Sequence, residues 1–199
     1  MFNGIINLFL KIFFLKYSKK NNFFFIKLNK KFFDMNMGDS LSIQGTCLTL
    51  INKYLFFFEF EFSHMTFLNI SNFKKKYFNF EKSLKYFNYI GGHIIISHNN
   101  NLFLLKNIFL YFNILKIYLL CYKKFKNFIF YKNSISVNGI SLTINEILIF
   151  KNYILLCFNL LKFTYNFTSI KFYNILDFIN IEFDLNIFFT LSIINDIII

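Results

Sequence analysis

The chain has 199 residues, a net charge of +12 and no proline, tryptophan or arginine. This length suits one large domain or two of about 100 residues, either of which can bury a core. The 34 phenylalanines and 22 lysines are typical of AT-rich genomes, because Phe, Lys, Ile, Asn and Tyr have AT-rich codons. Since base and phosphate recognition depends largely on arginine, the positive charge does not indicate a nucleic-acid-binding protein.

No stretch is predicted to span a membrane. The most apolar one, residues 102–122, is interrupted by two lysines, whereas a spanning helix needs about 18 apolar residues with few charges. The N-terminal residues lack a basic region and a small-residue cleavage site, so they are a poor signal peptide.

The cysteines form no CxxC pair and favour free thiols in a reducing, cytoplasmic compartment. We expect no metal site, because the histidines are widely scattered: His64, His93 and His98.

Two similar stretches carry the first structural prediction. Residues 38–49, GDSLSIQGTCLT, are echoed by residues 133–143, NSISVNGISLT. Both alternate polar and apolar residues and then reach a glycine, which is typical of a half-buried strand entering a turn with positive φ. One position differs in chemistry, because Cys47 in the first copy is Ser141 in the second. Alone, the repeat favours a plain hairpin turn over a ligand site.

Further repeats follow in the same order. Residues 77–83, YFNFEKS, are echoed by 178–184, FINIEFD, and residues 65–73 are echoed more weakly by 163–170, with Thr66 facing Thr164. Three blocks in one order predict a duplicated domain, with short strands forming small antiparallel barrels. We therefore expect an all-β protein with domains at 1–95 and 96–185. Residues 186–199 form a tail that is either a helix or an apolar strand, and we favour a short helix that serves oligomerisation.

The chain resembles the alpha-chain type of riboflavin synthase in six segments that keep the family's order. The opening MFNGII resembles Met-Phe-Thr-Gly-Ile-Ile, and IGGHIIISH resembles Gly-Gly-His-x-x-x-Gly-His. The other segments are GDSLSIQGTCLTL, the MTFLNISNF–FNFEKS region, YKNSISVNGISLTI and INIEFD. The resemblance implies two tandem six-stranded Greek-key barrels and a homotrimer. It also implies an active site between the N-terminal barrel of one subunit and the C-terminal barrel of the next.

The activity that the resemblance implies is a dismutation of two 6,7-dimethyl-8-ribityllumazine molecules by transfer of a four-carbon unit, without metal or organic cofactor. Stacking two identical substrates face to face would make orientation a large part of the catalysis. Two similar half-sites with a thiol in one and a hydroxyl in the other would suit unequal donor and acceptor roles. Association with lumazine synthase stays open.

Carried over residue by residue, the resemblance implies the following contacts. The N-terminal pocket would use Gly4, Ile5, Ile6, Cys47, Leu48, Thr49 and Thr66, and the C-terminal pocket Lys132, Ser141, Leu142, Thr143 and Thr164. Further substrate contacts would come from Glu61, Ser97, His98 and Asn99. Cys47 and Ser141 would lie next to the reacting carbons, and His98 and Asp184 would transfer protons.

Bland alternatives stand beside these roles. Cys47 is also suited to be a small buried thiol, Asp184 a surface carboxylate at a strand end, and Lys132 one more solvated lysine. For His93 we favour packing at the hinge between the domains. The chain departs from the family pattern at Met65, at Ser97, which replaces a glycine, and at residues 161–164, where Pro and Glu are lost. A non-catalytic lumazine- or flavin-binding protein on the same fold is the second interpretation, and a membrane-associated basic protein rests on composition alone.

Overall fold

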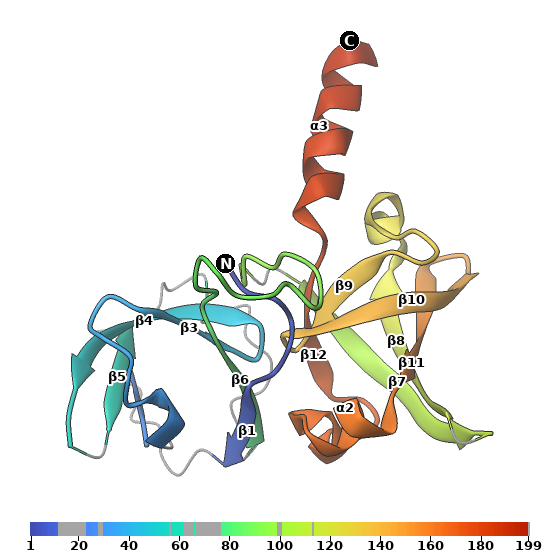
Figure 1. Cartoon of the computed structure of the whole chain (residues 1–199). Helices are drawn as coiled ribbons and strands as arrows, with labels where there is room; N and C mark the ends of the chain where they lie inside the picture. The colour runs from blue at the N-terminus through green and yellow to red at the C-terminus, as the bar shows by residue number, and fades with distance from the viewer. Residues whose placement is uncertain are drawn as a thin grey trace.

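The computed structural model describes residues 1–11, 23–27, 30–55, 57–61, 66, 77–98, 101–112 and 114–198. Two antiparallel β-sheets dominate it, one from each half of the chain (Figure 1). The first sheet contains β1 (Leu8–Lys11), β2 (Phe23–Ile26), β3 (Ser40–Ile43), β4 (Thr46–Lys53), β5 (Phe58–Glu61) and β6 (Tyr77–Lys82). The second contains β7 (Asn101–Tyr111), β8 (Ile114–Tyr122), β9 (Ser134–Val137), β10 (Ile140–Ile149), β11 (Tyr153–Leu160) and β12 (Phe178–Glu182). The all-β prediction is confirmed.

Short helical segments connect or follow the strands. They are the 3₁₀ turns η1 (Lys30–Phe32), η2 (Lys123–Phe128) and η3 (Ser169–Phe172), and the helices α2 (Lys162–Asn166) and α3 (Leu185–Ile198). The tail, which the sequence left between helix and strand, is therefore helical. In Figure 1, α3 extends away from the sheets. None of the helices in the described part of the chain is long and apolar enough to cross a membrane.

The two sheets share one strand order. The second is a closed barrel, β10-β11-β8-β7-β12-β9, and the first runs β1-β6-β3-β4-β5-β2. Numbering each half from its own first strand gives the same neighbours, except that β7 pairs with β8 whereas no pairing of β1 with β2 is found among the described residues. The second half is therefore a closed barrel as expected, and the described residues of the first half form a six-stranded sheet of the same strand order.

The repeated stretches form the predicted strands and turns. In each half a four-residue strand pairs with the next through a two-residue loop, so that Ser42 lies opposite Cys47 and Ser136 opposite Ser141. Both loop residues have positive φ, 53° and 75° in Gln44–Gly45 and 50° and 80° in Asn138–Gly139. Such type I′ turns match the right-handed twist of the flanking strands. The turns therefore set the register that places Cys47 and Ser141 at equivalent positions.

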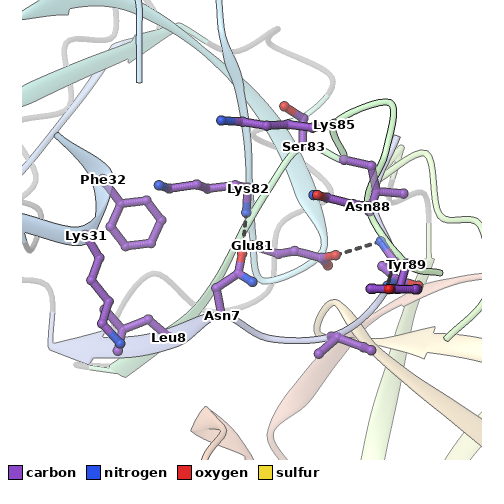
Figure 2. A pocket seen from close by; sticks show the side chains of 13 residues that line it. Asn7, Leu8, Lys31, Phe32, Glu81, Lys82, Ser83, Lys85, Asn88 and Tyr89 are labelled. Atoms are coloured by element: carbon purple, nitrogen blue, oxygen red, sulfur yellow. Dashed lines mark hydrogen bonds between the residues drawn. The ribbon is translucent and has the colours of Figure 1, made fainter. Parts of the chain in front are cut away.

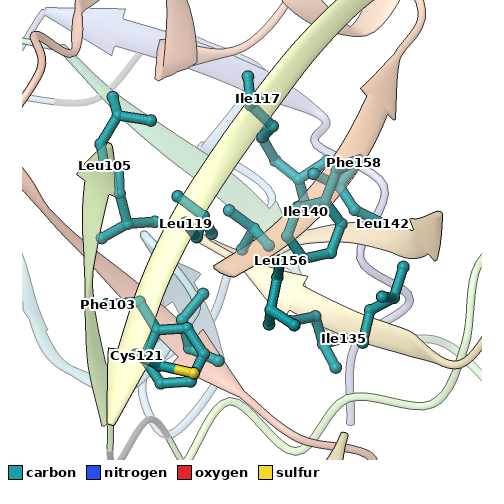
Figure 3. Packing of buried hydrophobic residues seen from close by; sticks show 14 of the residues in the cluster. Phe103, Leu105, Ile117, Leu119, Cys121, Ile135, Ile140, Leu142, Leu156 and Phe158 are labelled. Atoms are coloured by element: carbon teal, nitrogen blue, oxygen red, sulfur yellow. The ribbon is translucent and has the colours of Figure 1, made fainter. Parts of the chain in front are cut away.

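Each half has its own hydrophobic core. Alternate residues of β4 and β10 face inward, among them Leu48 and Leu50 in the first sheet and Leu142 and Ile144 in the second. The first core is rich in phenylalanine, whereas leucine and isoleucine fill most of the second (Figure 3). Alternate burial on strands that follow one another in a ring is what a small filled barrel requires. The residues that alternate with them on the same strands, including Cys47 and Ser141, are more exposed than these core residues.

The two halves meet at their hairpin turns. A Cβ atom added to Gly45 would lie 2.7 Å from the Gly139 nitrogen, and one added to Gly139 would lie 2.8 Å from the Gly45 nitrogen. The two backbones approach so closely that a side chain at either position would force them apart. The contact is reciprocal, which makes the arrangement of the two halves approximately two-fold.

Buried amide side chains surround this contact. Asn79 donates from Nδ2 to the Asn138 carbonyl (2.9 Å), and Asn180 donates from Nδ2 to the Gln44 carbonyl (2.8 Å). The Gln44 and Asn138 side chains in turn accept from the backbone amides of Asn79 and Asn180, at 3.2 and 2.9 Å. All four residues are buried, so leaving one group unpaired would cost about 1–3 kcal/mol. The duplicated Asn-x-Glu segments therefore hold the halves together.

Candidate functional site

A cavity of about 460 Å³ lies against the C-terminal barrel. Ser134 of β9 and Ser141 and Thr143 of β10 form one side of it, and the α2 region contributes Thr164 and Phe163. The other side is made by backbone from the N-terminal half, and the cavity lining there includes Gly4, Ile5, Ile6, Gly91 and Gly92. Hydroxyl groups, exposed backbone and two phenylalanines suit a polar ring that carries a hydroxylated chain. Three of the predicted C-terminal site residues, Ser141, Thr143 and Thr164, therefore line this cavity, whereas Leu142 is buried in the core of the barrel.

The N-terminal segment lines this cavity, whereas the family resemblance implies that Gly4, Ile5 and Ile6 belong to the pocket of Cys47. The Gly4 carbonyl accepts a hydrogen bond from the Ser141 amide (2.9 Å). Gly4 has a φ of 74°, and a Cβ atom there would lie 2.6 Å from the Ser141 Cβ. Phe2 pairs with Ile95 through backbone hydrogen bonds of 2.7 and 2.9 Å, which fixes this segment between the two halves.

The hinge segment lies against the N-terminal sheet in the same way. The Ser97 carbonyl accepts a hydrogen bond from the Cys47 amide (2.8 Å), and the Ser97 hydroxyl donates to the Ser42 hydroxyl (3.0 Å). Ser97 has a φ of 63°, the left-handed conformation that Gly4 also adopts and that favours glycine. His98 follows on the exposed side. Each hairpin is thus completed by a backbone segment from the other half of the chain. Gly4 contacts the hairpin of Ser141, and Ser97 contacts the hairpin of Cys47.

His93 is the clearest residue that the sequence interpretation missed. Its Nδ1 lies 2.7 Å from the Ser141 Oγ, although we favoured a packing role for it at the hinge. Burial lowers the pKa of His93, and the charge of nearby Asp184 partly opposes that shift. A neutral imidazole beside a hydroxyl at the cavity can accept or relay a proton near neutral pH. The Gly-Gly-His motif was the signal in the sequence that could have indicated His93. Gly92 lets the segment before His93 pack closely against Asn3, because a Cβ atom on Gly92 would lie 2.1 Å from the Asn3 carbonyl oxygen.

The remaining predicted residues lie elsewhere. Lys132 is exposed on a turn with a φ of 66°, its Nζ lies 5.2 Å from the centre of the Tyr131 ring, and it does not line the cavity. Asp184 accepts from the Asn186 amide (2.9 Å) at the start of α3. Glu61 is exposed at the end of β5 and Thr66 is half-buried, outside this cavity. Asn99 lies outside the described residues, as do residues 65 and 67–73 of the weaker repeat.

A larger cavity of about 660 Å³ lies beside β6 in the first half (Figure 2). Lys31, Lys82, Lys85, Phe32 and Tyr89 are among its lining residues, and Lys82 forms an ion pair with Asp34. Of the predicted site residues only Ile5 reaches it. The smaller cavity is the better candidate, because it gathers serine, threonine and backbone groups around Ser141. In the described part of the chain no group of His, Cys, Asp and Glu is placed to hold a metal ion.

Comparisons with known proteins bear on both halves. The family described as Lumazine binding domain matches residues 96–184. The riboflavin synthase of Buchnera aphidicola subsp. Schizaphis graminum (strain Sg) is 34% identical over 200 residues, covering 92% of this chain and 89% of that protein. Crystal structures of LumP with 6,7-dimethyl-8-(1'-D-ribityl) lumazine and with riboflavin match with TM-scores of 0.74 and 0.76 at 19% identity. These alignments cover 92% of this chain and 99% and 100% of those chains, and they establish the shared fold.

Proposed function

Because this chain belongs to the riboflavin synthase family, we propose that it converts two molecules of 6,7-dimethyl-8-ribityllumazine into riboflavin and 5-amino-6-(ribitylamino)pyrimidine-2,4-dione. A four-carbon unit leaves one substrate and joins the other, and the two products together contain all the atoms of the two substrates. The observation that carries the proposal is the hydroxyl-lined cavity at Ser141, whose hairpin is repeated at Cys47. Two similar half-sites suit a reaction between two copies of one molecule.

The cavity supports a specific division of labour. In this division Ser134, Thr143 and Thr164 offer hydroxyls to the ribityl chain, and Ile5 and Ile6 form part of the cavity wall for the ring. One substrate loses a proton from its 7-methyl group, and the resulting carbanion attacks a ring carbon of the other. Proton transfer at the Ser141 half-site falls to His93, through the Ser141 hydroxyl that it contacts. Cys47 and His98 serve the other half-site.

The assembly that we propose is a homotrimer in which the Cys47 half-site of one subunit faces the Ser141 half-site of the next. The family resemblance supplies this arrangement, and two features support it: α3 extends away from the sheets, and Phe189 and Ile193 on it are exposed (58% each). We place the domains at 1–95 and 96–185. The β2–β5 and β8–β11 pairings agree with Greek-key connections. A cytoplasmic location suits the three free cysteines.

A non-catalytic lumazine- or flavin-binding protein is the second candidate, favoured by the match to LumP complexes. A binding protein needs to hold its ligand but needs no proton-transfer groups next to it. The Ser141–His93 contact at the cavity supports the enzyme instead.

Turnover of 6,7-dimethyl-8-ribityllumazine by the purified protein, followed by riboflavin fluorescence, separates the two candidates. Mixed trimers then test the shared site. Cys47→Ala and Ser141→Ala subunits, each inactive alone, should regain part of the activity when they are dissociated and reassembled together, because some interfaces then carry neither change. Tight binding of the lumazine without riboflavin formation would favour the binding protein, and a mixture no more active than its components would contradict the shared site.

A further inference from the structure

Two glutamates at equivalent positions of the repeat hold the segments that complete the two hairpins. They are Glu81 at the end of β6 and Glu182 at the end of β12, both from the duplicated Asn-x-Glu pattern. Glu81 is 3% exposed, and the Glu182 carboxyl lies mostly inside the protein. Neither forms an ion pair with a lysine in the described part of the chain. Burying a carboxylate without a cationic partner is costly, so the backbone amides around it must compensate.

Glu81 binds the N-terminal segment through both oxygens. Its Oε1 accepts from the Asn3 amide (2.6 Å), and its Oε2 accepts from the Gly4 amide (3.1 Å). The carbonyl of Gly4 then accepts the Ser141 amide (2.9 Å). Figure 2 shows Glu81 extending from β6 toward Tyr89 and away from Phe32. A glutamate of the N-terminal sheet thus fixes backbone that lines the cavity of the C-terminal barrel.

Glu182 makes the reciprocal connection. Its Oε1 accepts from the amides of Ile96 and Ser97, both at 3.0 Å. The carbonyl of Ser97 accepts the Cys47 amide (2.8 Å). A glutamate of the C-terminal barrel therefore fixes the backbone that lies against the Cys47 hairpin of the N-terminal sheet.

We propose that Glu81 and Glu182 are positioning residues that act crosswise, each holding the backbone segment that completes the ligand half-site of the opposite barrel. Neither is placed to touch the reacting atoms, since each acts through a backbone segment. The position of the backbone segment at each half-site consequently depends on a glutamate of the opposite barrel. Replacing that glutamate should therefore weaken the backbone hydrogen bond at the hairpin of the other barrel. The consequences for ligand rest on the proposed function, whereas the crosswise geometry can be measured without any ligand.

Hydrogen exchange of the full-length protein, measured by mass spectrometry without ligand, tests the geometry. Glu81→Met should lower the protection of the Ser141 amide about tenfold or more, because the segment at Gly4 is no longer held and its carbonyl can move away from that amide. The protection of the Cys47 amide should be nearly unchanged. Glu182→Met should do the reverse. The matched control is Glu59→Met, since Glu59 is also buried (6% exposed) but bonds to Asn52 and Tyr54 within its own sheet. It should leave the Ser141 amide protected.

The result that would overturn the proposal is loss of protection in the barrel that carries the substitution, as expected of a glutamate that merely stabilises its own barrel. If a methionine variant fails to fold, Glu81→Gln and Glu182→Gln keep one acceptor oxygen and should show the same crosswise pattern at smaller size. Riboflavin titration completes the test. If the wild-type protein does not bind riboflavin, the proposed function is contradicted but the crosswise geometry is not. If the exchange effects are crosswise but both variants bind riboflavin with unchanged affinity, the positioning role is refuted.

Discussion

Replacing Gly4 by alanine tests the cavity wall most sharply. The φ of 74° alone costs a residue with a Cβ atom about 1–2 kcal/mol. The new methyl group would also lie 2.6 Å from Ser141 Cβ and from Ile95 Cδ1, and such overpacking typically costs about 1–3 kcal/mol more. We expect the free energy of unfolding to fall by about 2–5 kcal/mol, and the segment to be displaced from Ser141.

Gly38→Ala is the matched control. Gly38 has a φ of 90°, but a Cβ atom there would meet nothing within 4 Å. The control therefore carries the backbone cost without the steric one. For a chain of this size about 1 kcal/mol corresponds to roughly 2–4 °C in Tm. Thermal unfolding should show a drop at least twice as large for Gly4→Ala, and only that variant should lose riboflavin affinity. Equal drops in Tm with unchanged riboflavin binding in both would refute the placement of Gly4 against Ser141.

Three further predictions follow from single contacts. Ser97→Gly should be about 1 kcal/mol more stable than Ser97→Ala in urea unfolding, because both lose the hydroxyl bond but only glycine accepts the φ of 63° without strain; an alanine variant of equal or greater stability would contradict this. His93→Gln should lower kcat about 100-fold with little change in KM, because glutamine keeps polar contact but cannot transfer a proton; an unchanged kcat would exclude His93 from the chemistry. Burial raises the pKa of Glu81 and of Glu182 to about 7 from 4.5, so the folded state binds protons that the unfolded chain has released. The free energy of unfolding should therefore fall as pH rises from 4.5 to 7, by on the order of 3 kcal/mol per glutamate, and Glu81→Gln should flatten this slope in denaturant titrations. A slope unchanged by Glu81→Gln would contradict the assignment.

Local patterns in the sequence predicted the hairpins well. The alternation before Gly45 and Gly139 corresponds to β3 and β9, and both glycines adopt the positive φ expected of them. These features depend on neighbours along the chain, and a single sequence shows them. The strand register follows from the same turns, so the equivalence of Cys47 and Ser141 was also predictable.

Contacts between distant segments were harder to predict. The approach of His93 to Ser141 spans 48 residues and depends on a glycine-rich segment packing against Asn3, which no local pattern encodes. The contacts of Gly4 and Ser97 with the opposite halves were hard to predict for a similar reason. Glu81 and Glu182 hold these segments by binding backbone amides, and the sequence shows no side-chain partner that would reveal the contact. The apolar tail was ambiguous for another reason, since a run with few polar residues carries no clear period.

The stoichiometry of the reaction is the decisive test of riboflavin synthase activity in this protein. Purified protein is incubated with 6,7-dimethyl-8-ribityllumazine, and substrate, riboflavin and 5-amino-6-(ribitylamino)pyrimidine-2,4-dione are quantified by chromatography over time. Two substrate molecules should disappear for each riboflavin formed, with the pyrimidinedione appearing in equal amount to riboflavin. Binding of the substrate with no riboflavin at any enzyme concentration would contradict it.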